Sequence, residues 1–271
     1  MELLEKPGAA SLHPADNLCE KLLLSRENDL LTAWHGPVSA ILGGESSIMP
    51  SDAEVVRLRS LDTCAVSDAL DQLGLPGAVI GIQRVSAERR IVGRVIPVKL
   101  GPAGEVVASR HLCSAAIEAG TSNDVIVVEH HSRQDAAGWG GLLSTAASQR
   151  GISGTIVDGA VRDVDDSRDL NYPVFARSVV PRTARGRVTE HMWNEPIVVG
   201  GVDVKPGDLV IADGSGVVFV DAAQSSEVLE IAESIAAREA RLTTAVRTGT
   251  PVSRVMDGNY ESMLDRRRSS E

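Results

Sequence analysis

The spacing of apolar residues predicts that helices and strands alternate along most of the chain. Helical periodicity marks four segments, 51–74, 106–119, 139–150 and 225–249. Short apolar runs typical of strands lie at 91–98, 125–129, 155–158 and 173–176. Ser51 and Glu54 have the spacing of a capping box, Gly74 is expected to end the first helix, and Asp221 is expected to cap the last. This alternation is typical of an α/β protein.

The pattern changes after residue 186, where glycine, proline and aspartate divide the chain into short β segments. These segments are 187–192, 196–199, 202–208, 209–213 and 216–220. Short strands separated in this way are typical of a β meander or a small barrel. We therefore expect helices over a mixed sheet with a β-rich half, and not a doubly wound nucleotide-binding fold.

The two ends of the chain differ from this body. Leucines at helical spacing predict a helix over 16–34, followed by a linker containing glycine and serine. We therefore expect three parts: an N-terminal helical arm and linker at 1–50, a main domain at 51–248, and a C-terminal tail at 249–271. The arm could dock on the body, contact another subunit or act as a lid.

Composition and charge exclude several classes of protein. The 271 residues carry a net charge of −10 and are 43% hydrophobic but only 3% aromatic. The acidic balance and scarce aromatic residues argue against nucleic-acid binding. No apolar run approaches the roughly 20 residues that span a bilayer, and the first residues lack the features of a secretory signal. We expect a soluble, cytoplasmic protein that binds no membrane.

Familiar catalytic signatures are absent from the sequence. It contains no GxxxxGK[ST] loop, no GxGxxG between a strand and a helix, no GxSxG and no HExxH. The three cysteines have no CxxC spacing and are interpreted as small core residues. Phosphate-loop enzymes, Rossmann dehydrogenases and α/β-hydrolases are therefore disfavoured.

The segment VDGAVRDVDD at 157–166 is the first candidate for chemistry. Asp158 and Gly159 are expected to form a turn, which places Arg162 and Asp163 where a strand ends and α/β sheets position ligand groups. Arg162 could bind a carboxylate or keto oxygen through its planar fork, and Asp163 could ligate Mg²⁺ or Mn²⁺. The alternative is a solvated charged face with local ion pairs.

The segment GWGGLLSTAA at 138–147 is the second candidate. Gly140 and Gly141 precede a helix, so free N–H groups near Leu142 and Leu143 could bind a small carboxylate. The alternative is close packing of the helix against the sheet. A carboxylate site, an arginine and a metal-binding aspartate together would stabilise the enolate of a 2-oxo acid.

Other polar residues have simpler interpretations. His130 and His131 could reach the site as acid–base groups or ligands, but a pair of loop histidines without a third ligand favours a solvent-facing position. Asp208 and Asp213 are interpreted as turn formers, and Asp68 as a cap or a pairing partner within its helix.

These motifs resemble the RraA-like family, which includes the class II pyruvate aldolases such as 4-hydroxy-4-methyl-2-oxoglutarate/4-carboxy-4-hydroxy-2-oxoadipate aldolase. The resemblance covers about residues 55–248 and rests on RGxxGxxxDGxxRD at 150–163 and PGDxxxxD at 206–213, with SLDTCAVSDALDQLG and YPVFAR in consistent order. It implies an α-β-β-α sandwich of the swivelling-domain type, assembled as a homotrimer or homohexamer with its site at a subunit interface.

The resemblance also implies roles for individual residues. Arg162 would contact the keto oxygen of the pyruvyl unit, Asp163 would bind Mg²⁺ or Mn²⁺, and the amides of Leu142 and Leu143 would hold the carboxylate. Glu239 is the match for a glutamate that helps hold metal-bound water from a neighbouring subunit. Gly141 departs from the family, because aldolases often carry an acidic residue there that supports the water shell of the metal.

The expected function is metal-dependent retro-aldol cleavage of a 4-hydroxy-2-oxo acid to pyruvate and a second carbonyl compound. Oxaloacetate decarboxylation is expected as a side activity because it produces the same enolate. Two alternatives remain: a non-catalytic RraA-type regulator that binds a ribonuclease or helicase, and a related lyase used in a biosynthetic pathway.

Overall fold

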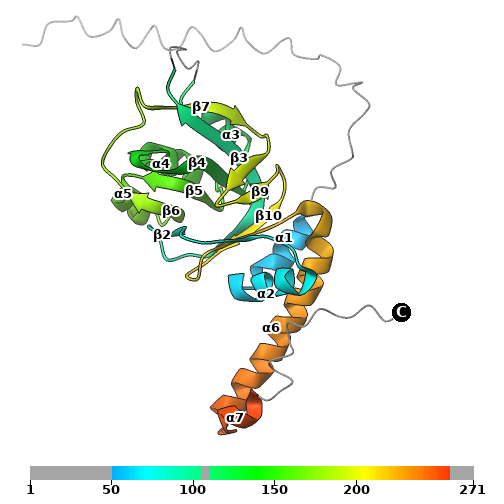
Figure 1. Cartoon of the computed structure of the whole chain (residues 1–271). Helices are drawn as coiled ribbons and strands as arrows, with labels where there is room; N and C mark the ends of the chain where they lie inside the picture. Colours follow the sequence, from blue (N-terminus) through cyan, green and yellow to red (C-terminus); the bar gives the residue numbers. More distant parts are fainter. Residues whose placement is uncertain (1–50, 105–109, 257–271) are drawn as a thin grey trace, which may run out of the picture. The chain divides into compact units, whose positions relative to one another are not determined.

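The computed structural model describes residues 51–104 and 110–256 (Figure 1). The predicted arm at 1–50 and residues 257–271 of the predicted tail at 249–271 lie outside the described residues. The helices are α1 (Asp52–Arg59), α2 (Thr63–Leu73), α3 (Ser114–Ala119), α4 (Gly141–Gln149), α5 (Val164–Asp169), the 3₁₀ turn η1 (Ala222–Gln224), α6 (Ser225–Arg247) and α7 (Val252–Val255). The strands are β1 (Ala78–Val79), β2 (Gln83–Arg84), β3 (Ile91–Pro102), β4 (Asp124–Ala137), β5 (Gly154–Val161), β6 (Val174–Val179), β7 (Val188–Trp193), β8 (Ile197–Val199), β9 (Val202–Val204), β10 (Leu209–Ala212) and β11 (Val217–Val220).

Within these ranges one mixed sheet runs in the order β1-β11-β10-β3-β4-β5-β6-β2, and β7 pairs with the far end of β3. The central strands β3, β4, β5 and β6 are parallel, whereas β10 and β11 join antiparallel. β8 and β9 form a separate hairpin. The four parallel strands therefore end at one common edge, where ligand sites of α/β sheets lie.

Three apolar clusters define four layers. One cluster packs α3 and α4 on β3 to β6, a second packs α1, α2 and α6 on β10 and β11, and the third lies between the two halves of the sheet (Figure 1). The α/β class and the predicted sandwich of helix, sheet, sheet and helix are thus confirmed. Of the described residues, no helix combines the length and apolarity needed to cross a bilayer.

Strand β3 belongs to both halves of the sheet. Side chains alternate between the two faces of a strand, so Ile91 and Val95 point into the cluster between the sheets. On the opposite face, Val92 contacts the cluster under α1, α2 and α6, whereas Val98 and Leu100 contact the cluster under α3 and α4. A single long strand therefore connects the two helical layers.

The helix predicted over 51–74 is wrong in one respect, because two helices occupy this segment. The capping box of Ser51 and Glu54 begins α1, but α1 ends at Arg59. The Asp62 carboxylate then accepts the N–H of Ala65 at 2.8 Å and begins α2. A new N-cap three residues after the end of α1 thus starts a second helix, although the apolar spacing continues through the segment.

The helix predicted over 106–119 is also shorter than expected, because α3 begins only at Ser114. Cys113 has a left-handed backbone, with φ of 64°, and its N–H donates to the Glu190 carboxylate at 2.7 Å. Residues 105–109 lie outside the described residues. Asp221 caps the 3₁₀ turn that precedes α6, and does not cap α6 itself.

The predicted turn at Asp158 and Gly159 is wrong. Both residues lie within β5 and pair with Glu129 and Arg133 of β4, which continues to Ala137 and not to 129 as predicted. The chain turns only after Val161. This extension of the two strands moves Arg162 and Asp163 to the carboxyl edge of the sheet.

Candidate functional site

A small cavity of about 100 Å³ lies at the carboxyl end of β5. It brings together six of the seven predicted site residues, which are Gly140, Gly141, Leu142, Leu143, Arg162 and Asp163. The remaining lining residues were not singled out from the sequence and include His111, Trp139, Thr183 and Arg185. Two segments about twenty residues apart in the sequence therefore meet at one site.

Strand β5 delivers Arg162 and Asp163 to this cavity. Every residue of β5 is buried, so the strand is held from both faces. Directly after it, Asp163 adopts a left-handed conformation with φ of 54° and ψ of 41°, a region that aspartate tolerates better than most residues. The Arg162 N–H donates to the carbonyl of Trp139 at 3.0 Å, which ties the end of β5 to the segment before α4.

The Asp163 carboxylate has one oxygen engaged and one available. Its Oδ2 accepts the N–H of Gly141 at 3.1 Å and lies 3.2 Å from Nε of Arg162. No hydrogen bond joins Oδ1 to any residue in the described part of the chain. The side chain is 38% exposed, so a cation or a water molecule can reach this oxygen. The local ion pair expected from the sequence is present, and it still leaves a free carboxylate oxygen.

Gly140 and Gly141 permit the close approach of α4 to β5. A Cβ on Gly140 would lie 2.9 Å from Oδ2 of Asp163 and 3.3 Å from Cγ of Arg162. A Cβ on Gly141 would collide with the carboxylate of Asp166. Close packing, one of the two interpretations of these glycines, is therefore observed.

The N-terminus of α4 also retains free backbone donors. The N–H groups of Leu142 and Leu143 make no hydrogen bond to the described residues, as is usual in the first turn of a helix. The positive end of the helix dipole lies at the same place. The Leu142 side chain is 81% exposed while that of Leu143 is buried, so the turn is reachable at the cavity. Two backbone donors therefore remain free here, and their predicted role in binding a carboxylate stays a prediction.

A buried hydrogen-bonded chain holds α4 against α5. The indole Nε1–H of Trp139 donates to Oγ of Ser144 at 2.8 Å, and Ser144 lies 2.8 Å from Oγ of Ser167. Ser167 in turn donates to the carbonyl of Asp163 at 3.5 Å. Trp139, Ser144 and Ser167 are all at most 2% exposed. This chain, which the sequence interpretation missed, connects the glycine turn to the backbone of Asp163.

The two histidines after Val128 do not line the cavity, and the expectation of two solvent-facing side chains is wrong for His130. Its ring is buried between Gly138 and Gly159, and Nε2 lies 2.8 Å from the carbonyl of Ala136. Burial lowers the pKa of His130. His131 is exposed and its Nδ1 lies 3.2 Å from the carboxylate of Glu129.

The predictions for the other aspartates and for the cysteines are confirmed in part. Asp208 and Asp213 each accept two backbone N–H groups and are turn formers as expected. Asp68 was expected to cap or pair within α2, but it makes no hydrogen bond or ion pair to the described residues, and burial raises its pKa. Cys113 is buried as predicted, whereas Cys64 is exposed.

Glu239, the seventh predicted site residue, lies on α6 and does not line this cavity. Partial burial, together with the charges of Asp62 and Asp68, raises its pKa. Its predicted role was toward the site of a neighbouring subunit, so that role stays a prediction.

The chain is similar in sequence to proteins of one known family. A family model described as RraA-like, Aldolase/RraA, matches residues 63–219. A protein of Halalkalibacterium halodurans named "Putative 4-hydroxy-4-methyl-2-oxoglutarate aldolase" is 30% identical over 183 residues, which cover 66% of this chain and 81% of that protein. Protein DlpA of Legionella pneumophila is 30% identical over 213 residues, or 79% of this chain. These cover 34% of DlpA, so the chain spans about a third of that relative.

Solved structures have the same fold. An uncharacterized protein from Pseudomonas syringae pv. tomato is 30% identical, with a TM-score of 0.69 over 76% of this chain and 98% of that one. Streptomyces coelicolor RraAS2, described as an unusual member of the RNase ES inhibitor RraA family, is 24% identical. Its TM-score is 0.64 over 70% of this chain and 96% of that one, which shows the fold alone.

Proposed function

Because this chain belongs to the RraA-like family, we propose that it is a divalent-metal-dependent carbon–carbon lyase. The proposed reaction is retro-aldol cleavage of a 4-hydroxy-2-oxo acid to pyruvate and a second carbonyl compound. The observation that best supports this proposal is that Arg162, Asp163 and the free N–H groups of α4 lie at one cavity. The names of relatives as aldolases support the same class of reaction.

The residues present fit a hard divalent cation. Oδ1 of Asp163 is free, and the carboxylate of Asp166 lies against Gly141 beside it. Mg²⁺ is commonly held by one or two carboxylates together with water and substrate oxygens. No group of three or more histidine, cysteine or acidic side chains suited to a metal occurs among the described residues, so this site would supply at most two carboxylates. A bound Mg²⁺ or Mn²⁺ would polarise the keto oxygen of the substrate.

Arg162 and the first turn of α4 would orient the substrate. The N–H groups of Leu142 and Leu143 bind its C1 carboxylate, and the Arg162 guanidinium donates to the C2 keto oxygen. Water in the cavity accepts the proton of the 4-hydroxyl, and C4 becomes the carbonyl carbon of the second product. The C3–C4 bond breaks at the same time, and its electron pair forms the C2–C3 double bond of pyruvate enolate. Arg162 stabilises the negative charge on the enolate oxygen, and protonation at C3 gives pyruvate. Oxaloacetate loses CO₂ to the same enolate.

The test measures pyruvate release from 4-hydroxy-4-methyl-2-oxoglutarate and from oxaloacetate, with Mg²⁺ or with EDTA. Arg162→Ala is expected to lower kcat/KM by roughly 10²–10³-fold, as for loss of one oxyanion donor. Asp163→Asn should abolish the response to Mg²⁺. Arg168→Ala, which removes an exposed arginine paired with Asp165, is the matched control and should keep full activity.

Absence of cleavage of both acids with Mg²⁺ and with Mn²⁺ would refute the lyase proposal. Capture of a ribonuclease or helicase by the inactive protein would then favour the regulator. The homotrimer or homohexamer with Glu239 at the neighbouring site is part of the proposal. Light scattering checks the assembly, and Glu239→Gln is expected to weaken Mg²⁺ binding measured by calorimetry.

A further inference from the structure

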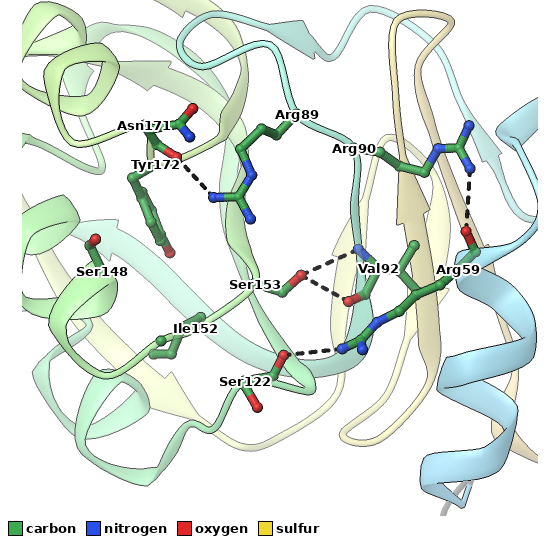
Figure 2. A pocket seen from close by; sticks show the side chains of 11 residues that line it. Arg59, Arg89, Arg90, Val92, Ser122, Ser148, Ile152, Ser153, Asn171 and Tyr172 are labelled. Atoms are coloured by element: carbon green, nitrogen blue, oxygen red, sulfur yellow. Dashed lines mark hydrogen bonds between the residues drawn. The ribbon is translucent and has the colours of Figure 1, made fainter.

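Figure 2 shows a second cavity, of about 510 Å³. Its lining residue Ser153 directly precedes β5 and Arg162 directly follows β5, so the cavity lies at the opposite end of this strand from Arg162. Its walls come from α1, from the loop before β3, from the end of α4 and from the loop before β6. The lining residues that matter for its chemistry are Arg59, Arg89, Arg90, Ser122, Ser148 and Ser153. The proposed lyase reaction uses none of these side chains.

The side chains that line this cavity carry positive charge. Three arginines line it and no aspartate or glutamate does. None of the three makes an ion pair with a described residue, whereas eight other arginines of the described ranges do, among them Arg57 and Arg94. In a chain with 37 acidic and 27 basic residues, a cavity lined by three arginines and by no acidic side chain is suited to bind an anion.

Neutral oxygen atoms hold these arginines in place. Nη1 of Arg89 donates to the carbonyl of Asn171 at 3.1 Å, and Nη2 of Arg59 donates to the side-chain oxygen of Asn123 at 2.7 Å (Figure 2 shows both arginines). Arg90 donates to a carbonyl in the turn between α1 and α2. These contacts orient the side chains without cancelling their charge, and each guanidinium keeps further N–H donors for a ligand.

We propose that this cavity binds a small, multiply charged oxyanion, either phosphate-bearing or polycarboxylate. Guanidinium groups match both oxyanions in bidentate geometry, and the Ser148 hydroxyl, which makes no hydrogen bond to the described residues, adds a donor. A volume of about 510 Å³ is within the usual range for sites of small molecules. The site is distinct from the lyase cavity, because α4 presents its N-terminus to one and its last turn to the other.

Binding would connect the two helical layers. Arg59 belongs to α1, which packs on the β10–β11 half, whereas Arg89 contacts Asn171 beside β6 in the other half. An anion held between them binds only the folded chain, so the thermal midpoint should rise with ligand concentration.

The experiment titrates the full chain with sodium pyrophosphate and, separately, with citrate. Calorimetry and thermal denaturation are measured without divalent metal, since both anions chelate Mg²⁺. The double variant Arg59→Gln/Arg89→Gln is compared with Arg162→Ala, which alters the lyase cavity, and with Arg247→Gln, which removes one exposed charge from the last turn of α6. Arg89→Gln alone serves if the double variant fails to fold.

The double variant is expected to bind the preferred anion at least about tenfold more weakly, the loss of a charge-assisted hydrogen bond. Arg162→Ala and Arg247→Gln should bind as the unaltered chain does, which separates this site from the lyase site. Tighter binding of pyrophosphate would identify the ligand as phosphate-bearing, and tighter binding of citrate would identify it as a polycarboxylate. Equal affinity for the two would indicate that the cavity recognises the negative charge of the anion and not its chemical group. The proposal is overturned if neither anion binds below about 1 mM, or if either control weakens binding as much as the double variant.

Discussion

The buried chain of Trp139, Ser144 and Ser167 allows a quantitative test of how the candidate site is held. Ser144→Ala removes the acceptor of the indole N–H, and Trp139 is only 2% exposed, so water cannot replace it. A buried donor left without a partner costs about 1–3 kcal/mol. We expect the free energy of unfolding to fall by that amount.

Ser167→Ala should cost less, about 0.5–1.5 kcal/mol, because Ser144 still accepts the indole N–H. The double variant should be about as stable as Ser144→Ala alone, since both lack the Ser144–Ser167 hydrogen bond and the double variant additionally loses only the long bond from Ser167 to the carbonyl of Asp163. The two changes are therefore predicted to be strongly non-additive.

Urea denaturation of the four proteins measures these differences, and Ser148→Ala on the same helix is the control. Its hydroxyl makes no hydrogen bond to the described residues, so its effect should stay within about 0.5 kcal/mol. If Ser144→Ala costs less than Ser167→Ala, or less than about 0.5 kcal/mol, the chain does not anchor α4 and the reasoning is wrong. Under the proposed function, Ser144→Ala should also raise the KM for the 2-oxo acid, because the amides of α4 shift.

Three other perturbations test single contacts. Gly93→Ala would place a Cβ 2.6 Å from the carbonyl oxygen of Asn123 and should destabilise by about 1–3 kcal/mol in urea, a cost that Asn123→Ala would not relieve because the clash is with backbone. Burial lowers the pKa of His130, so the folded state binds its proton less tightly than the unfolded state, and the free energy of unfolding should decline as pH falls below about 6.5. His130→Gln should reduce that decline in pH-dependent denaturation. Gly141→Glu forces the Asp166 carboxylate aside and sets like charges together, so it should be destabilising, and Asp166→Asn should restore part of the loss in a thermal melt.

The class of fold could be predicted from apolar periodicity, because each layer buries one face of a regular element. Element ends could not be predicted as well, since they depend on individual hydrogen bonds, local or distant in sequence, that apolar periodicity does not record. The left-handed Cys113, whose N–H is held by Glu190, delays α3, and the cap of Asp62 divides a helix whose apolar spacing is continuous. The extension of β4 to Ala137 depends on its irregular pairing with β5, which no alternation of residues in either strand records.

The site shows the same division. Arg162 and Asp163 follow a buried strand directly, so a local motif was sufficient to select them. The hydrogen-bonded chain of Trp139, Ser144 and Ser167 could not be predicted, because a serine on an apolar helix face has no distinctive spacing. Ser167, the partner of Ser144, also lies 23 residues away in the sequence.

The two interpretations of Gly140 and Gly141 that the sequence suggests are compatible with each other. The sequence allowed two interpretations, close packing or an anion site, as if one excluded the other. In the structure the missing Cβ atoms let α4 approach Arg162 and Asp163, and Gly141 donates its N–H to the Asp163 carboxylate. That contact uses one backbone donor and leaves those of Leu142 and Leu143 beside the guanidinium. Close packing is therefore the means by which the free amides, the arginine and the carboxylate come together at one cavity.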